Sequence, residues 1–405
     1  MSSTVKYTDM GWPEENALWK YYLLSEPLLS AELARLAFTK SHGNTDCVTF
    51  QPSPNPDDRS QDRYAVQDWA LSDGTWQFRA VFDGHAGHDT VEHTVKTLPG
   101  MIQSSLSTLL LSTNDTPDEE AVGNLLQDAI IALDDGLTKD LLALFPSVDS
   151  LSKLSDDKIR AIINDHDSGG KNSGIITRCM RGTTVLISLV NPKRSRLWVA
   201  SLGDCQAALG VREADGDWRS TLLSSYHNGS NVVEQERVKS EHPGEPEAIL
   251  EDRVLGAIAV TRAVGDHLFK LPVEYTGRVF MNASPGFNIS RKIEEFLGRN
   301  LTPPYVSNLA EVQVIRLEKK QYHLVMCSDG LLDLYQDKGM ELLGLGDYWV
   351  QLLGKREKPW DDSNLALYLL RDALGGDDAV LVSRSMTVEL TFRWMDDTTI
   401  LVQKI

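Results

Sequence analysis

The sequence contains little cysteine, and the residues that it has are scattered. The four cysteines among 405 residues, Cys47, Cys179, Cys205 and Cys327, show no C-x-x-C spacing. This pattern fits neither a disulfide framework nor a thiolate zinc site. It predicts a protein that works in a reducing compartment.

Long apolar runs and an excess of positive charge are also missing. No stretch of about 18 apolar residues is present, so no transmembrane helix is predicted. The formal net charge of -18 argues against nucleic-acid binding, which needs a basic face. No arginine precedes Arg35, whereas Asp9, Glu14 and Glu15 lie near the start, unlike an arginine-rich transit peptide. We therefore expect a soluble cytoplasmic protein with no nucleic-acid partner and no membrane span.

The residues that are present favour a folded chain of mixed helices and strands. Hydrophobic residues make up 41% and include nine tryptophans, enough for a sizeable core. Alternating residues predict a hairpin of strands 63–69 and 76–82 around the turn Ser72-Asp73-Gly74-Thr75. Apolar periodicity predicts helices over 14–38, 88–111, 119–144, 231–241, 342–353 and 365–374.

The second half of the chain reads as rich in strands. We predict strands at 183–190, 196–202, 206–211 and 398–402, and a hairpin of 311–317 with 322–326. Residues 146–180 are polar and rich in glycine and serine, which suggests a mobile insertion. Hairpins toward both ends, with helices between them, predict an α+β fold of antiparallel sheets covered by helices.

The stretch Val81-Phe82-Asp83-Gly84-His85-Ala86-Gly87 carries the first chemical signal. An apolar strand would deliver Asp83 to its end, and Gly84 would let the backbone turn and place His85 beside the carboxylate. Asp-Gly is equally typical of a plain turn. Asp62 stands at the entrance of the partner strand, so an antiparallel pair would bring both carboxylates to one rim.

Two more aspartates have a similar placement. Asp329 ends an apolar strand and precedes Gly330, and Asp396 precedes the last strand. Clustered carboxylates resist ionisation unless a divalent cation lies among them, and oxygen ligands favour magnesium or manganese over zinc. Two such ions can activate a bridging water for attack on phosphorus, and an imidazole can protonate the leaving alkoxide. His88 and His93 have a poor spacing for sharing a ligand and are expected to be surface histidines.

Six short motifs follow one another along the chain: Asp83-Gly84-His85-Ala86-Gly87, Gly182-Thr183-Thr184, Gly203-Asp204, Thr261-Arg262-Ala263-Val264-Gly265-Asp266, Ser328-Asp329-Gly330-Leu331-Leu332-Asp333 and Asp396-Asp397-Thr398-Thr399. They come in the order of the metal-dependent protein phosphatase 2C family, which the chain resembles from about residue 45 to 405. Segments such as Tyr226-His227-Asn228 and Glu241-His242-Pro243 are similar to the pyruvate dehydrogenase phosphatase branch. That resemblance implies a β-sandwich of two antiparallel sheets flanked by helices. It also implies a helical extension over 1–44 and a catalytic domain over 45–405 with insertions near 112–180 and 267–308.

The resemblance implies a site with two Mg2+ or Mn2+ ions and a phosphorylated protein as substrate. The residues that it assigns are Asp83, the Gly84 carbonyl, Asp329 and Asp396 as metal ligands, His85 as general acid, Arg59 as a phosphate-binding arginine, and Asp62, Gln61 and Asp333 as their neighbours. A solvated loop arginine is the alternative for Arg59. The branch resemblance also allows a mitochondrial address.

Three positions depart from the family pattern. Gln61 replaces the usual glutamate, Cys179 stands where an aspartate for a third metal is expected, and Tyr226 replaces the aspartate of the branch's Asp-His-Asn. The predicted activity is hydrolysis of phosphoserine or phosphothreonine in proteins. The alternative is a catalytically weak member of the fold that serves as a binding or regulatory module, and a lyase or nucleotidyl cyclase is more distant.

Overall fold

The computed structural model describes residues 4–55, 59–114, 117–287, 293–356 and 364–405. The chain forms two compact units, each made of separate segments. Unit 1 consists of Met1–Val66, Gln206–Leu223 and Leu317–Ile405, and unit 2 of Gln67–Cys205 and Ser224–Arg316. The single catalytic domain expected over 45–405 stays a prediction.

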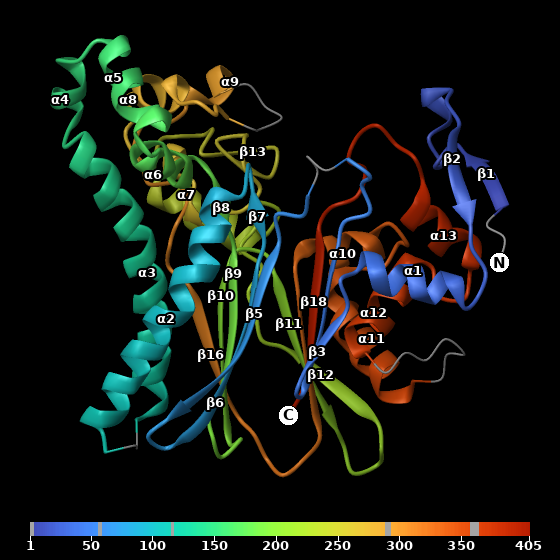
Figure 1. The fold of residues 1–405 in the computed structure, drawn as a ribbon. Helices are drawn as coiled ribbons and strands as arrows, with labels where there is room; N and C mark the ends of the chain where they lie inside the picture. The colour runs from blue at the N-terminus through green and yellow to red at the C-terminus, as the bar shows by residue number, and fades with distance from the viewer. Residues whose placement is uncertain (1–3, 56–58, 115–116, 288–292, 357–363) are drawn as a thin grey trace. The chain divides into compact units, whose positions relative to one another are not determined.

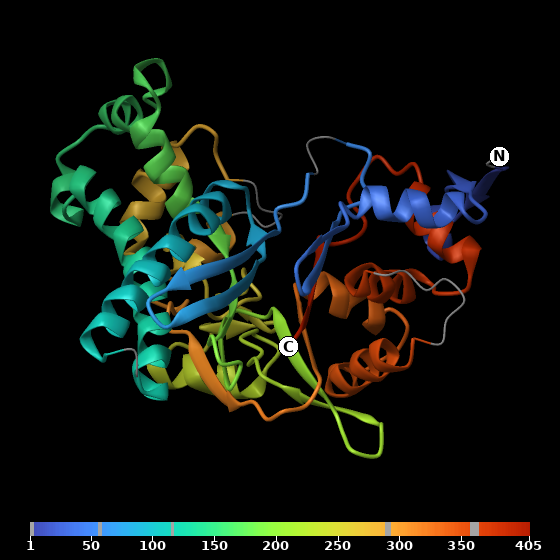
Figure 2. The same cartoon turned by 60° about the horizontal axis from the view of Figure 1, so that its bottom comes forward.

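Unit 1 is built on a six-stranded antiparallel sheet in the order β12-β11-β17-β18-β4-β3. Its strands are β1 (Thr4–Thr8), β2 (Trp19–Leu23), β3 (Lys40–His42), β4 (Thr45–Phe50), β11 (Gln206–Arg212), β12 (Trp218–Leu222), β17 (Tyr322–Cys327) and β18 (Thr398–Lys404). Its helices are η1 (Pro13–Glu15), α1 (Leu28–Leu36), α10 (Asp329–Gln336), α11 (Leu342–Lys355), α12 (Leu365–Leu374) and α13 (Ala379–Thr387). Helix α11 packs against β11 and β12, and α12 against β4 and β18 (Figure 2).

Unit 2 is built on a five-stranded sheet in the order β16-β10-β9-β6-β5. Its strands are β5 (Arg63–Leu71, which begins in unit 1), β6 (Gly74–Phe82), β7 (Gly84–His85), β8 (Gly182–Thr183), β9 (Val185–Val190), β10 (Arg196–Leu202), β13 (Ile249–Leu250), β14 (Arg253–Val254), β15 (Val264–Gly265) and β16 (Glu311–Arg316). Its helices are α2 (Asp89–Ser112), α3 (Glu119–Leu144), α4 (Val148–Ser152), α5 (Asp156–Ile163), η3 (His166–Ser168), α6 (Lys171–Met180), α7 (Val232–Glu241), η4 (His267–Phe269), α8 (Val273–Arg278), η5 (Phe280–Asn282) and α9 (Ile293–Leu297).

The long helices α2 and α3 lie side by side, and α3 packs against β10 and β16 (Figure 1). Asp118 caps α3, because its side chain accepts a hydrogen bond from the amide of Ala121 at 2.6 Å. Strand β9 is buried along its whole length, and five of its six residues are apolar. A small sheet, β15-β8-β7, begins where β6 ends and carries the candidate site of this unit.

The predicted fold class is confirmed: the chain is a mixed α+β protein with antiparallel sheets and helices. The hairpin of β5 and β6, the two long helices and the closing strand all lie where the sequence predicts them. Of the described helices, none is long and apolar enough to cross a membrane.

Three local predictions are wrong. The helix expected over 14–38 forms only as α1, while Trp19–Leu23 is a strand paired with β1, since its aromatic residues suit a pleated surface. Residues 146–180 are not a structureless insertion: Ser147 and Ser155 cap α4 and α5, and both α5 and α6 bury apolar side chains. Strands β16 and β17 form no hairpin, because β16 pairs with β10 in unit 2 and β17 pairs with β11 and β18 in unit 1.

Candidate active site

Asp83 and His85 lie at the end of β6 in unit 2, as the sequence predicts. The amide of Asp83 donates to Thr184 Oγ1 at 3.2 Å, and the amide of Thr184 donates to the Asp83 carbonyl at 2.9 Å. These bonds extend the pairing of β7 with β8 and fix the start of the Asp-Gly-His turn. Both side chains are partly exposed, so the turn presents a carboxylate and an imidazole to solvent.

The imidazole of His85 contacts a buried carboxylate across this small sheet. His85 Nε2 lies 2.7 Å from Asp266 Oδ2, and the Asp266 side chain is 3% exposed. A buried carboxylate at this distance stabilises a protonated imidazole, the form that a general acid needs. Gly182 leaves the room for this pair, because a Cβ there would lie 2.1 Å from both His85 Nε2 and Asp266 Oδ2.

A second carboxylate lies beside Asp83. Asp204 is 2% exposed, and its carboxylate comes within 4.8 Å of that of Asp83. Asn228 Nδ2 donates to Asp204 Oδ2 at 2.8 Å and holds this side chain in place. Two carboxylates this close, one of them buried, are a donor set that suits a hard divalent cation.

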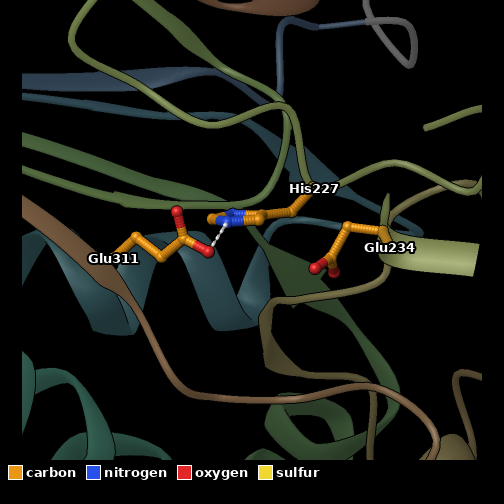
Figure 3. A group of neighbouring side chains, drawn as sticks. All are labelled: His227, Glu234 and Glu311. Carbon is orange, nitrogen blue, oxygen red and sulfur yellow. Dashed lines mark ion pairs between the residues drawn. The ribbon is translucent and has the colours of Figure 1, made fainter. Parts of the chain in front are cut away.

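His227, Glu234 and Glu311 form another group with the ligand atoms of a metal site, but their hydrogen bonds argue against that role. Figure 3 shows His227 between the two glutamates, with its Nε2 3.4 Å from Glu311 Oε1. His227 Nδ1 accepts a hydrogen bond from the Gly203 amide at 3.2 Å, so the ring proton is on Nε2 and no lone pair there is available to a metal. Burial lowers the pKa of His227, which keeps the ring neutral.

The glutamates of this group are already paired with arginines. Glu234 contacts Arg262 at 2.6 Å and Arg237 at 3.0 Å, and Arg262 also contacts Glu311 at 2.9 Å. Burial alone would raise the pKa of Glu234, but its bonds to Arg262 and Arg237 and to Thr261 lower it to about 2. We conclude that this network is structural. Through His227 and Asn228 it holds Gly203 and Asp204.

In unit 1, Asp62 and Asp397 form a buried acidic pair. Asp62 Oδ2 accepts from Ser328 Oγ at 2.6 Å, whereas its Oδ1 is buried and makes no hydrogen bond to the described residues. Burial and the neighbouring Asp397 raise the pKa of Asp62 to about 7. A cation near Asp62 would favour the charged carboxylate again, whereas Asp397 is already paired with Arg393 at 2.9 Å.

The other predicted residues of unit 1 differ in exposure. Asp329 begins α10 directly after Ser328 and is partly exposed, and Asp333 is exposed one turn later. The Asp396 side chain is 50% exposed and contacts Arg393 at 2.6 Å, whereas Asp397 is buried and accepts from the Gln61 amide at 2.8 Å. Within this unit it is therefore Asp397, not Asp396, that contacts the Gln61-Asp62 turn. Arg59 is exposed, as the alternative of a solvated loop arginine expects.

The sequence profile described as "Protein phosphatase 2C" matches residues 57–340. The chain belongs to this family. It is therefore a phosphatase of a metal-dependent class, as the order of its motifs predicts.

Named relatives support the same identification. A protein phosphatase 2C homolog of Schizosaccharomyces pombe is 28% identical over 382 residues, which cover 87% of this chain and 79% of the relative. Mitochondrial pyruvate dehydrogenase phosphatase 1 of Rattus norvegicus is 29% identical over 385 residues, covering 80% and 71%. The serine-threonine phosphatase 2C of Toxoplasma gondii has a TM-score of 0.51 at 15% identity over 91% of this chain and 97% of that one. A C. elegans sex determining protein has the same score and identity over 90% and 65%.

The phosphatase contains two site residues that the sequence interpretation did not single out. Asp204 and Asp266 both stand in the quoted motifs, each after a glycine at a strand end, so their placement was visible. Their roles were not, because the partners of both are remote in sequence. Cys179 is fully buried and its thiol donates to the Leu137 carbonyl at 3.6 Å, and burial raises its pKa, so it is an apolar core residue.

Proposed function

We propose that this phosphatase hydrolyses phosphoserine and phosphothreonine in proteins at a site for two Mg2+ or Mn2+ ions. The proposed ligands are Asp83, the Gly84 carbonyl, Asp329 and Asp396, with Asp204 as a further candidate from its position beside Asp83. The observation that carries the proposal is the contact of His85 with the buried Asp266, because His85 lies two residues after Asp83. The bound ions would supply a water of lowered pKa for attack on phosphorus.

The residues of the chain have separate tasks in this reaction. The proton on His85 Nε2 is shared with Asp266, which orients the ring, so the proton that passes to the leaving serine or threonine oxygen would be the one on Nδ1. Asp62 is buried, and its carboxylate accepts a hydrogen bond from Ser328. We therefore propose that it stays fixed and orients a neighbouring group. We propose a phosphorylated protein as substrate. The pyruvate dehydrogenase phosphatases among the relatives make a mitochondrial substrate one candidate.

One variant tests the metal-dependent reaction. Asp329→Asn removes a charge that balances the cations while burying no new polar group, so the fold should persist and turnover should be lost. The measurement is hydrolysis of a phosphoserine peptide and of nitrophenyl phosphate at saturating manganese, with Asp337→Asn, an exposed aspartate at the end of the same helix, as the comparison. Near-full activity of Asp329→Asn would overturn the ligand assignment.

The rival function is a catalytically weak member of the fold, and Gln61 favours it. A carboxamide at this position offers only a dipolar oxygen to a second metal, where the family pattern has a carboxylate. No hydrolysis of either substrate by the purified chain, at any manganese concentration, would favour the rival.

A further inference from the structure

A cavity of about 690 Å³ lies in unit 2 next to the small sheet that carries His85. Its lining starts at Ala86, the residue after His85, and continues along α2 and the end of α6. The basic residues His88, His93, Lys96, Arg178 and Arg181 all line it. His88 and His93, expected at the surface, are partly buried in this lining.

Arg181 is a buried charge with few partners. The residue is 3% exposed, and its Nη2 donates to the Gly286 carbonyl at 2.6 Å. Its Nε lies 4.0 Å from Asp89 Oδ2, and neither Nε nor Nη1 makes a hydrogen bond to the described residues. A buried guanidinium with two unused donor groups is costly, and an oxyanion would satisfy both its charge and its donors.

The acids of the cavity are already paired with residues of its own walls. Asp89 accepts a hydrogen bond from Thr177 Oγ1 at 2.9 Å, and Glu92 pairs with Lys96 at 3.2 Å. Arg178 is partly buried, and its Nε has no hydrogen-bond partner in the described part of the chain. The lining therefore has one cation more than its acids, in a protein whose net charge is -18.

The cavity is tied to the proposed reaction through the backbone. Arg181 directly precedes β8, whose Gly182 pairs with His85 of β7. The amide of Asp266 donates to the Arg181 carbonyl at 2.9 Å, so one residue links the cavity to the His85–Asp266 pair. A substrate chain with its phosphoserine near His85 would reach the cavity within a few residues.

We propose that this cavity binds an oxyanion, a carboxylate or second phosphate a few residues from the phosphoserine of the substrate. The inference rests on the proposed function and adds a preference for acidic or doubly phosphorylated segments. Planar guanidinium groups suit both anions, because their paired donors match two oxygens at once. Free inorganic phosphate has the same anionic oxygens, so it is the alternative source of the bound oxyanion.

The kinetic test compares two peptides that differ only in one position. One carries a single phosphoserine, and the other adds a second phosphoserine two to four residues away. We expect kcat/KM to favour the second peptide about tenfold in the wild type, the size of one charge-assisted hydrogen bond. Arg178→Gln should bring this ratio close to one, while Lys171→Gln, an exposed lysine at the start of α6, should leave it unchanged. Equal kcat/KM for both peptides in the wild type would overturn the preference.

A binding test does not depend on turnover. Calorimetry of the full chain in chelator, with inorganic phosphate or with a doubly phosphonated peptide, measures anion binding without metal ions. The proposal is supported if the phosphonated peptide binds about tenfold more weakly to Arg178→Gln and with unchanged affinity to Lys171→Gln. This result would hold even if neither phosphoserine peptide is hydrolysed. If inorganic phosphate binds more weakly to Arg178→Gln but not to Lys171→Gln, the cavity is an oxyanion site that free phosphate occupies. Binding that is absent, or equal in all three proteins, overturns the proposal.

Discussion

His85 and Asp266 are separated by 181 residues, and their contact gives His85 a role that can be measured. If His85 is a general acid, His85→Gln should slow hydrolysis of phosphoserine peptides by about 10²–10⁴-fold and hydrolysis of nitrophenyl phosphate much less, because nitrophenolate leaves without a proton. The measurement is kcat on both substrates at saturating manganese. Asp266→Asn should also lower kcat more on phosphoserine peptides than on nitrophenyl phosphate, but by smaller factors than His85→Gln.

His166, an exposed histidine of the same unit, provides the matched control for this prediction. His166→Gln should leave kcat on both substrates within about twofold of the wild type, as for most surface changes. Equal losses on the two substrates in His85→Gln would instead indicate a structural role or a role in positioning the metal water.

Gln61 leads to a prediction about metal affinity. The backbone amide of Gln61 donates to Asp397 Oδ2, and the next residue, Asp62, forms the buried acidic pair with Asp397. Gln61→Glu adds a third carboxylate there, so it should lower the thermal midpoint in chelator and raise it in manganese. We also expect a lower manganese concentration for half-maximal activity.

The comparison for Gln61 is Gln313→Glu, which adds the same charge at an exposed position of β16. That variant should change neither the thermal midpoint in manganese nor the metal requirement. Two tight metal sites of similar affinity in the unmodified protein would show that Gln61 is no defect.

At the scale of elements, the turn that follows β12 holds the turn that follows β10. The amide of His227 donates to the Gly203 carbonyl at 3.0 Å, Gly203 donates back to His227 Nδ1, and Asn228 holds Asp204. The Tyr226-His227-Asn228 segment thus positions an acidic side chain beside Asp83. The change from aspartate to tyrosine at 226 leaves both of these contacts in place.

Asn228→Ala should therefore weaken metal binding or activity by about 10–100-fold, the usual effect of removing a group that orients a ligand. The measurement is the manganese dependence of phosphopeptide hydrolysis together with calorimetric metal affinity. Gln235→Ala on α7, which loses a hydrogen bond to the Gly229 carbonyl, should leave both unchanged. A loss of thermal stability without a change in metal affinity would show that Asn228 only supports the fold.

At the scale of the whole molecule, buried histidines set how stability depends on pH. His267 is fully buried against Thr138, and burial lowers its pKa to about 4 despite the nearby Asp134, which forms an ion pair with Lys270. The folded state keeps His267 neutral between pH 6.5 and 4, whereas the unfolded state binds a proton. Stability is therefore fully present above pH 6.5 and falls as pH drops toward 4.

We expect this one residue to reduce the free energy of unfolding by on the order of 2 kcal/mol between pH 6.5 and 5. Urea unfolding across that range measures the free energy of unfolding at each pH. This free energy should depend less steeply on pH in His267→Gln than in the wild type, although the variant is less stable at neutral pH. The exposed His42 is the control, and His42→Gln should keep the wild-type slope. An unchanged slope in His267→Gln would contradict the prediction.

The sequence by itself determined the elements and the chemistry that depend on neighbours along the chain. Apolar periodicity is local, so it placed α2, α3, α12 and β9 correctly, and the turn chemistry of residues 72–75 placed the hairpin. The six ordered motifs likewise identified the family, because each is a short run of residues that one strand end or turn requires.

Tertiary structure decided the pairings and the partners of the charged groups. Strands β16 and β17 belong to different sheets, because β16 pairs with β10 and β17 pairs with β11, each more than 100 residues away in the sequence, and no local pattern encodes these pairings. Trp19–Leu23 became a strand because β1 pairs with it, against a periodicity that favours a helix. Asp266 and Asn228 gained their roles only through contacts with His85 and Asp204, since a side chain's charge state and orientation depend on what folding places beside it.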